Sequence, residues 1–443
     1  MLKHSLLVVV LVAASLAQSQ NKKSQRSPSK APQPAASGGT VVLRGGKLLT
    51  ITHGVIENGV LVIQNGKIAA VGAAGSTAIP SGAKVINVTG MTVYPGLIDS
   101  ETHLGLVEVS ADRSTNDTLE NSDEIMPHMH VYDAFHAETA LIPVARINGI
   151  TNAIVAPAAG DTLPGQDAFI QLSGRSASEM LMVRDVALPL NFTGSQRRNE
   201  SFDRAKFPQT RMGMAAQLRQ AFLDAQDYEQ KVADYEKKKS ADKPGTPPKK
   251  DLKFEALLPY LHGQKPVVLA AEEPTDVETA LDLAHEFHLK VVLNHVTHSA
   301  SLLDKIAATG FPVIVGAIYE EPKEYERYDA VFRLPAEMVR HGIKIAFASY
   351  DAHQVRNLPY AAGYAVGFGL PYDEALKAIT INPAQMWGVD QQLGSLDVGK
   401  LANVVVANGD PLDVKTDVKH VFIAGEEIPL VNRQTELRDR YWQ

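Results

Sequence analysis

Five ionisable residues each follow a short apolar segment of the chain, and their types are those that bind metals or move protons. Glu101 and His103 follow VYPGLID, Glu272 follows KPVVLAA, His295 follows KVVLN, and Asp351 follows KIAFASY. If the segment before them is a strand, Glu101 and His103 point to the same side, because they are two residues apart. Carboxylates and imidazoles that meet at one point predict a site for a divalent ion, with a carboxylate that accepts a proton from water.

Short apolar segments alternate with helical stretches over the middle of the chain, which is the pattern of parallel β/α units. The pattern predicts strands in TVYPGLID, TNAIVAP, FIQLSG, VALPLNF, KPVVLAA, KVVLNH, FPVIVGA and KIAFAS, and helices in VETALDLAHEFH and ASLLDKIAAT. Eight strands predict an α/β fold of the (β/α)8 TIM-barrel type, whose reacting groups lie at the C-terminal strand ends. FIQLSG is short, and it is also compatible with one arm of a hairpin.

Residues 40–91 and 391–430 are both rich in β patterns, and we expect them to form one small β-sandwich. VVLRGGKLLT and GVLVIQNGKIAAVG lie in the first group, with a hairpin signal at Asn65-Gly66, and ANVVVANG and HVFIAGEEI lie in the second. Two or three short strands are marginal in water, so neither group buries an apolar face alone. The barrel then spans residues 92–390, and residues 431–443 form a C-terminal tail.

A long insertion begins near Met212 and carries apolar residues at helical spacing as far as Tyr235, before the charged stretch KKKSADKPGTPPKK. This spacing predicts an amphipathic helix that packs on the barrel. A lid or a partner-binding surface is the alternative interpretation.

The N-terminal region has the features of an export signal. Basic Lys3 precedes the apolar run LLVVVLVAA, and small residues near Ala17 offer a cleavage point, so residues 1–17 are interpreted as a signal peptide and 18–38 as a disordered linker. The run is too short to span a bilayer. The chain has no cysteine, which excludes disulfides and a lipidated cysteine. We therefore expect a periplasmic or secreted protein.

Charge argues against a nucleic-acid partner. The formal net charge is −7, and the five positive charges of residues 1–38 leave −12 for the remainder of the chain. A body this acidic is a poor phosphate binder. A small molecule or a small peptide is the expected partner, and the sequence leaves the oligomeric state open.

Several ordered motifs resemble the amidohydrolase superfamily over nearly the whole chain. VYPGLIDSETHLGL is similar to the first-strand motif in which PG-(Phe/Leu)-ID precedes a His-x-His metal pair. ITINPAQMWGVDQQLGSLDVGKLANVVV resembles the closing segment of the family, and Leu43 to Gly72 resembles its opening segment. TRMGMAAQLRQAF and VRNLPYAAGYAVGFGL are similar to imidazolonepropionase-like and prolidase-like members. The resemblance implies metal-dependent hydrolysis of a carbon–nitrogen bond.

Some of the family's metal-binding positions are matched in this chain and others are not. His103 matches the second His of the His-x-His pair, and His295 matches the metal-binding His of the sixth strand. Asp351 matches the eighth-strand Asp, which in the family binds metal and takes the proton of the attacking water. Glu101 stands where the first His belongs, and near the fifth-strand His the chain has Ala270.

The fourth strand also departs from the family pattern, because no lysine lies between Met182 and Lys206 to bridge two metals. The resemblance therefore implies a degenerate site with at most one ion, zinc or, since its donors are rich in oxygen, manganese or iron. Its candidate ligands are Glu101, His103, His295 and Asp351, with Glu272 as a further candidate. A vacant site, in which Glu101 is hydrogen-bonded and no metal is bound, is the alternative.

Two functions are compatible with these residues. The first is an exported hydrolase that acts on an amide, a cyclic amide or a small peptide, with a single metal that activates water and Asp351 as the base. The second is a binding protein that keeps the amidohydrolase fold after its chemistry has lapsed. The surviving Asp351 and two imidazoles favour the hydrolase.

Overall fold

The structure, a computed structural model, describes residues 39–120, 122–192, 207–208, 210–241 and 245–442. The predictions of a signal peptide at residues 1–17 and of a linker at 18–38 lie outside these ranges. Within them, no helix is both long enough and apolar enough to cross a bilayer.

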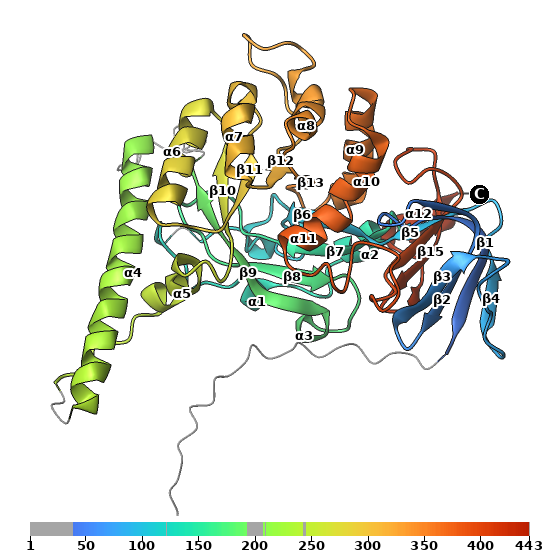
Figure 1. Ribbon diagram of the computed structural model, residues 1–443, viewed down its shortest axis with the longest axis horizontal. Coiled ribbons are helices and arrows are strands. Elements are labelled where there is room, and N and C mark those ends of the chain that lie inside the picture. The colour runs from blue at the N-terminus through green and yellow to red at the C-terminus, as the bar shows by residue number, and fades with distance from the viewer. Residues whose placement is uncertain (1–38, 121, 193–206, 209, 242–244, 443) are drawn as a thin grey trace, which may run out of the picture.

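Eight strands form a nearly closed barrel sheet, which confirms the predicted α/β barrel (Figure 1). Each strand overlaps one of the eight apolar segments identified in the sequence, although the first half of TVYPGLID forms a strand of the other sheet. In sheet order they are β13 (Ile345–Phe347), β12 (Val313–Val315), β11 (Val291–His295), β10 (Val267–Ala271), β9 (Leu181–Asn191), β8 (Asp167–Gln171), β7 (Ile150–Val155) and β6 (Leu97–Thr102). The two edges approach each other where the backbone N–H of Tyr350 donates to the carbonyl oxygen of Glu101 over 3.0 Å.

The barrel departs from eight parallel units at one strand. β8, in the segment FIQLSG and the residues before it, runs antiparallel to both β7 and β9, while the other barrel pairs are parallel. A parallel crossover needs a dozen or more residues and usually a helix. The chain between β8 and β9 holds only the four-residue helix α3 (Ala177–Met180), so a hairpin-like return is the connection that fits.

Helices cover the outer face of the parallel strands, as Figure 1 shows. Those that follow β10 to β13 are α6 (Pro274–Glu286), α7 (Leu303–Thr309), α8 (Ala330–Arg340), α9 (Leu358–Gly367), α10 (Tyr372–Ala378) and α11 (Ile381–Met386). The predicted helices VETALDLAHEFH and ASLLDKIAAT correspond to α6 and α7. The short helices α1 (Val131–Ala134) and α2 (Leu141–Arg146) precede β7, and α12 (Arg433–Tyr441) ends the described chain.

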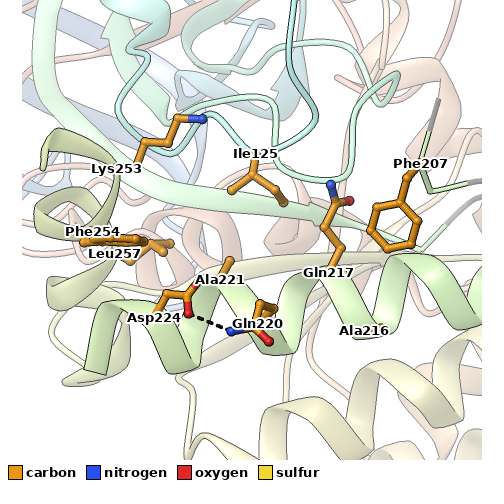
Figure 2. A pocket seen from close by; sticks show the side chains of 10 residues that line it. All are labelled: Ile125, Phe207, Ala216, Gln217, Gln220, Ala221, Asp224, Lys253, Phe254 and Leu257. Atoms are coloured by element: carbon orange, nitrogen blue, oxygen red, sulfur yellow. Dashed lines mark hydrogen bonds between the residues drawn. The ribbon is translucent and has the colours of Figure 1, made fainter. Parts of the chain in front are cut away.

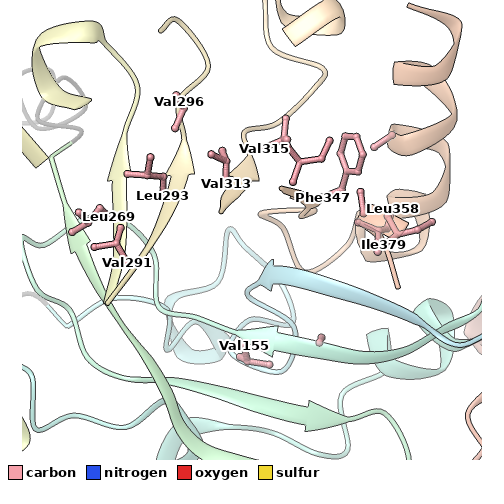
Figure 3. Packing of buried hydrophobic residues seen from close by; sticks show 14 of the residues in the cluster. Val155, Leu269, Val291, Leu293, Val296, Val313, Val315, Phe347, Leu358 and Ile379 are labelled. Carbon is pink, nitrogen blue, oxygen red and sulfur yellow. The ribbon is translucent and has the colours of Figure 1, made fainter. Parts of the chain in front are cut away.

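Both faces of the parallel strands are buried, because neighbouring residues of a strand belong to two different apolar clusters. Leu269, Leu293 and Phe347 lie in a cluster with residues of the covering helices, and in Figure 3 Val313 and Val315 lie between Leu293 and Phe347. Val268 and Val292 lie in a second cluster with Trp387 of the segment after α11. This burial on both sides explains why the parallel strands are nearly continuous apolar runs in the sequence.

Strands from both ends of the described chain form a second sheet. Its members are β1 (Val41–Leu49), β2 (Val55–Gln64), β3 (Lys67–Ala73), β4 (Lys84–Asn87), β5 (Thr92–Pro95), β14 (Val404–Ala407), β15 (Val418–Ile423) and β16 (Glu426–Ile428). β14 pairs with β5, which joins the two groups. The turn between β2 and β3 places Asn65 at φ 52° and Gly66 at φ 75°, the two positive values that a type I′ turn requires. The exact division of the chain into domains stays a prediction.

The insertion forms α4 (Arg211–Ser240), which packs beside α5 (Leu252–Leu261) (Figure 1). Its buried residues end at Ala225, and Met212 at its start is 80% exposed. The helix therefore packs by its first half, as the ordinary packing interpretation expects.

Candidate active site

The five predicted site residues all lie at the C-terminal ends of barrel strands. Glu101 is within β6 and His103 follows it, Glu272 follows β10, His295 ends β11, and Asp351 lies four residues after β13. This is the end of the barrel at which such folds carry their chemistry.

Among the described residues, Glu101 is hydrogen-bonded to an amide and forms no ion pair with a basic side chain. Its Oε2 accepts a hydrogen bond from Asn294 Nδ2 over 2.6 Å. Burial raises the pKa of Glu101 to about 8; the bond from Asn294 lowers it, and the charge of Asp99 raises it further. The arrangement favours a carboxyl group that keeps its proton at neutral pH.

Two more carboxyl groups are buried beside Glu101. Asp99 is fully buried in β6 and accepts hydrogen bonds from the backbone N–H groups of Glu101 and Ser349, over 3.2 and 3.0 Å. Burial raises its pKa to about 7. Burial, and then the nearby Glu101, raise the pKa of Asp167 in β8 well above its usual range. We call Asp99, Glu101 and Asp167 the axial carboxyl set.

Asn294, Tyr350 and His295 complete the surroundings of Glu101. The Tyr350 hydroxyl lies 2.6 Å from Asn294 Oδ1 and 3.0 Å from the carbonyl oxygen of Val315. The Tyr350 ring stacks on the His295 ring, with centroids 4.6 Å apart and planes inclined by 21°. Burial lowers the pKa of His295 to about 4, and its Nδ1 has no hydrogen-bond partner in the described part of the chain. Both features favour the neutral form of the His295 imidazole.

The backbone around this group is strained. His295, Val296 and Tyr350 have φ values of 67°, 56° and 55°. These are left-handed conformations that side chains other than glycine rarely adopt, least of all a β-branched valine. Strain of this kind persists where the surrounding structure fixes it, and it concentrates at functional sites.

His103 and Asp351 lie close enough to interact electrostatically. The Nδ1–H of His103 donates to the carbonyl oxygen of Ala156 over 2.9 Å, because a carbonyl can only accept. Burial lowers the pKa of His103, and the charge of Asp351 partly offsets this. The Oδ1 of Asp351 accepts the backbone N–H groups of His353 and Gln354, which orients a side chain that is 47% exposed.

A second polar group lies at the ends of β10, β11 and β12. His298 is buried, and its Nδ1 is 2.9 Å from Glu326 Oε2, which also accepts the backbone N–H of Lys323. Glu272 and Glu320 interact electrostatically with His298, and Lys323 lies 3.6 Å from Glu273. Burial raises the pKa of Glu272, while His298 and Lys323 lower it. We call Asp351, Glu272 and Glu326, with His298 and Lys323, the rim set.

The donors do not fit the metal that the resemblance implies. Among the residues that the structure describes, no three or more histidines, aspartates or glutamates are grouped so that they could hold an ion. Glu101 bonds to Asn294, and Asp351 accepts backbone N–H groups of its own loop. The bond from His103 Nδ1 to the Ala156 carbonyl is itself compatible with a metal ligand, because it leaves Nε2 free. The five predicted ligands thus lie at one end of the barrel, but they are not close enough together to surround one ion. They are Glu101, His103, His295, Asp351 and Glu272.

Sequence reasoning missed Asn294, Tyr350, Asp167 and Glu326. Asn294 directly precedes His295, and Tyr350 directly precedes Asp351. The strand ends that identified His295 and Asp351 could therefore have identified these two neighbours as well. Asp167 and Glu326 lie in segments without a recognisable motif, and only the fold brings them to the barrel end.

A separate groove lies between α4 and α5, apart from these residues. It measures about 460 Å³ and is lined mainly by apolar side chains, with Gln220 and Asp224 hydrogen-bonded to each other over 2.6 Å (Figure 2). None of its lining residues belongs to the axial or rim set, so the groove does not contribute to the acid–base chemistry of the barrel end.

Comparison with known proteins agrees with the fold and with the motifs. The model of the amidohydrolase family matches residues 274–428. Over 367 residues, 78% of this chain, the sequence is 26% identical to the amidohydrolase tasK of Hapsidospora irregularis, and it spans 37% of that protein's length.

Solved structures cover more of the chain. The crystal structure of an amidohydrolase from Thermotoga maritima MSB8 has a TM-score of 0.79 and 25% identity, and the match covers 89% of this chain and 100% of that one. A prolidase complexed with N-methylphosphonate-L-proline has a TM-score of 0.55 and 18% identity, covering 88% of this chain and 99% of that one. At that identity the prolidase shows a common fold alone.

Proposed function

We propose that the chain is an exported enzyme that hydrolyses a carbon–nitrogen bond in an amide, a cyclic amide or a small peptide. Its similarity to amidohydrolases in sequence and in fold supports this proposal. The match of residues 274–428 to the amidohydrolase family supports a hydrolase that acts on C–N bonds. The substrate class and the export of the protein go beyond this similarity. Export is supported by the signal-like residues 1–17, and N-terminal sequencing of native protein tests it: a mature start near Gln18 is expected, and an intact Met1 contradicts it.

The observation that carries the proposal is the placement of Asp351. Its carboxylate is half exposed at the barrel end, is oriented by two backbone N–H groups, and lies close enough to His103 to act on its pKa. A carboxylate with these properties can hold a water molecule and take its proton. The water oxygen then bonds to the carbonyl carbon. The C–N bond breaks with its electron pair on nitrogen, which receives the proton from Asp351.

Metal dependence is part of the expectation from the sequence, which predicts one divalent ion. Members of the amidohydrolase family are usually metal-dependent. The arrangement of donors in this chain does not support an ion at the barrel end, and no step above passes through one. Elemental analysis of protein purified without chelator measures this directly.

The test is a screen of dipeptides, N-acyl amino acids and cyclic amides with the wild type, Asp351→Asn and the control Asp439→Asn. Asp439 lies on α12, where its side chain is 66% exposed. Losing a general base typically costs ~10²–10⁴ in rate, so Asp351→Asn is expected to lose that much while the control keeps its rate. Equal rates for both variants would contradict the role of Asp351.

A second candidate function is that of a binding protein whose chemistry has lapsed. Two observations favour it. The described residues form no ligand shell, and the chain has Ala270 near the place where the family has the histidine of its fifth strand. No turnover across the whole screen, with or without added zinc, manganese or iron, would put this function ahead.

A further inference from the structure

A groove of about 680 Å³ lies between α9 and the loop that joins β14 to β15. We call it the aromatic groove. Leu412 of the loop is buried, and a Cβ atom at Gly363 of α9 would collide with the carbonyl oxygen of Leu412. The glycine therefore lets the loop pack directly against the helix. α9 lies on the side of the barrel next to the second sheet, to which β14 and β15 belong (Figure 1).

Stacked and edge-on rings line the groove on the side of α9. Tyr364 contacts Phe332 of α8 and Phe368, with ring centroids 5.1 and 5.4 Å apart. Tyr319, in the loop after β12, meets the Tyr364 ring edge-on at 6.1 Å. The neighbouring rings fix Tyr364, yet it is 45% exposed, and Tyr319 is 58% exposed. Tyrosines that are both exposed and held in place are typical of surfaces that bind a partner.

Two carboxylates of the loop also line the groove. Oδ1 of Asp410 accepts hydrogen bonds from the Tyr372 hydroxyl and from the backbone N–H of Leu412, both over 2.9 Å. Oδ1 of Asp413 accepts the backbone N–H of Lys415, also over 2.9 Å. Within the described part of the chain, neither carboxylate forms an ion pair, and no lysine, arginine or histidine lines the groove. Both carboxylates are thus oriented, and each keeps Oδ2 for a ligand.

We propose that the aromatic groove binds a peptide segment that carries arginine or lysine. A guanidinium or ammonium group is attracted by the face of a tyrosine ring, and the two carboxylates complement its charge. The volume of the groove is in the range that accommodates a drug-sized ligand, so it holds several residues and not one cation alone. The groove shares no residue with the axial or the rim set, and its binding does not depend on the proposed function.

Calorimetric titration of the full chain tests the proposal at low ionic strength. The probe is a blocked hexapeptide of alternating arginine and glycine. Saturable binding that weakens as salt is added is expected, because salt screens charges that are exposed to solvent. The same peptide with glutamate in place of arginine is expected not to bind. The proposal is overturned if the arginine peptide does not bind, or if both peptides bind equally.

Variants of the groove show whether the peptide binds there. Tyr319→Ala is expected to weaken binding about two- to fivefold, the size of one exposed cation–π contact, while Tyr319→Phe keeps the ring and the affinity. Tyr325→Ala is the matched control, since Tyr325 is 75% exposed and does not line the groove. Replacing Asp410 and Asp413 together by asparagine is expected to cost about three- to tenfold.

Equal affinity of the wild type, Tyr319→Ala and the double asparagine variant would place the peptide elsewhere on the acidic surface and overturn the groove as its site. Arginine amide distinguishes a free small cation from a peptide segment. It fills less of the groove, so its affinity is expected to be at least about tenfold lower than that of the hexapeptide. An affinity equal to that of the hexapeptide would assign the groove to a small cation and overturn the peptide segment.

Discussion

The two sets of carboxyl groups at the barrel end differ in what surrounds them. In the axial set, Asp99 and Asp167 are buried and Glu101 is partly buried. Glu101 accepts from an amide and Asp99 from backbone N–H groups. In the rim set, Glu326 lies 2.9 Å from the imidazole of buried His298, and Asp351 is half exposed to water. Water and a basic partner favour the ionised form, and a buried neutral partner favours the protonated one.

The difference assigns two chemical tasks to side chains of the same type. Ionised carboxylates accept protons, and neutral carboxylic acids donate hydrogen bonds. A barrel that places both within reach of one substrate has an acid and a base without recruiting further residue types, which is the arrangement expected when environments push the pKa values of two carboxyl groups apart. Variants in each set can break or sharpen this contrast.

The largest expected effect is on the rate. Asp351→Asn removes the proposed base at the rim and is expected to cost ~10²–10⁴ in kcat. Glu272→Gln, at the neighbouring strand end, is the rival and is expected to have a small effect. The measurement is kcat for both variants on the best substrate of the screen. Activity that survives Asp351→Asn and disappears in Glu272→Gln would move the base to Glu272.

An intermediate effect is expected on stability. Glu326→Ala leaves His298 buried without its hydrogen-bond partner, which typically costs about 1–3 kcal/mol. Asp167→Asn in the axial set exchanges one neutral group for another and is expected to stay within about 0.5 kcal/mol of the wild type. Urea unfolding midpoints compare the two variants. A larger loss for Asp167→Asn would show that the axial set is ionised and would break the comparison.

The smallest expected effect concerns the hydroxyl of Tyr350. Tyr350→Phe keeps the ring against His295 and removes the group that contacts Asn294 and Val315. One lost hydrogen bond of this kind costs about 1 kcal/mol. Freed from Tyr350, the Asn294 amide can turn, so the pH dependence of unfolding should also change. Thermal unfolding of both proteins across the pH range measures this change. A pH profile of stability equal to that of the wild type would contradict the idea that Tyr350 fixes the orientation of the Asn294 amide.

The sequence predicted the barrel well because its strands are buried on both faces. Such strands are continuous apolar runs, and all eight were identified, including FIQLSG with its hairpin alternative. The pairing of β14 with β5 was harder to predict from the sequence, because pairing between strands more than three hundred residues apart leaves no local periodicity. The sheet from both chain ends was expected only because neither group of strands could be stable alone.

The candidate site was only partly predictable. Strand ends and spacing located Glu101, His103, His295 and Asp351, because these residues follow apolar runs directly. Their partners could not be found in the same way. The contact between Asn294 and Glu101 depends on side-chain direction across the barrel, and Glu326 reaches His298 from a loop twenty-eight residues later.

The contrast between the two sets depends on the protonation of Glu101 at neutral pH, and infrared spectroscopy measures it most directly. The carbonyl stretching band of a protonated carboxylic acid is separate from the bands of ionised carboxylates. The difference spectrum between the wild type and Glu101→Gln at neutral pH, in chelator, is expected to contain a protonated-acid band that disappears on raising the pH above about 8. A difference spectrum that contains only bands of an ionised carboxylate would contradict the claim.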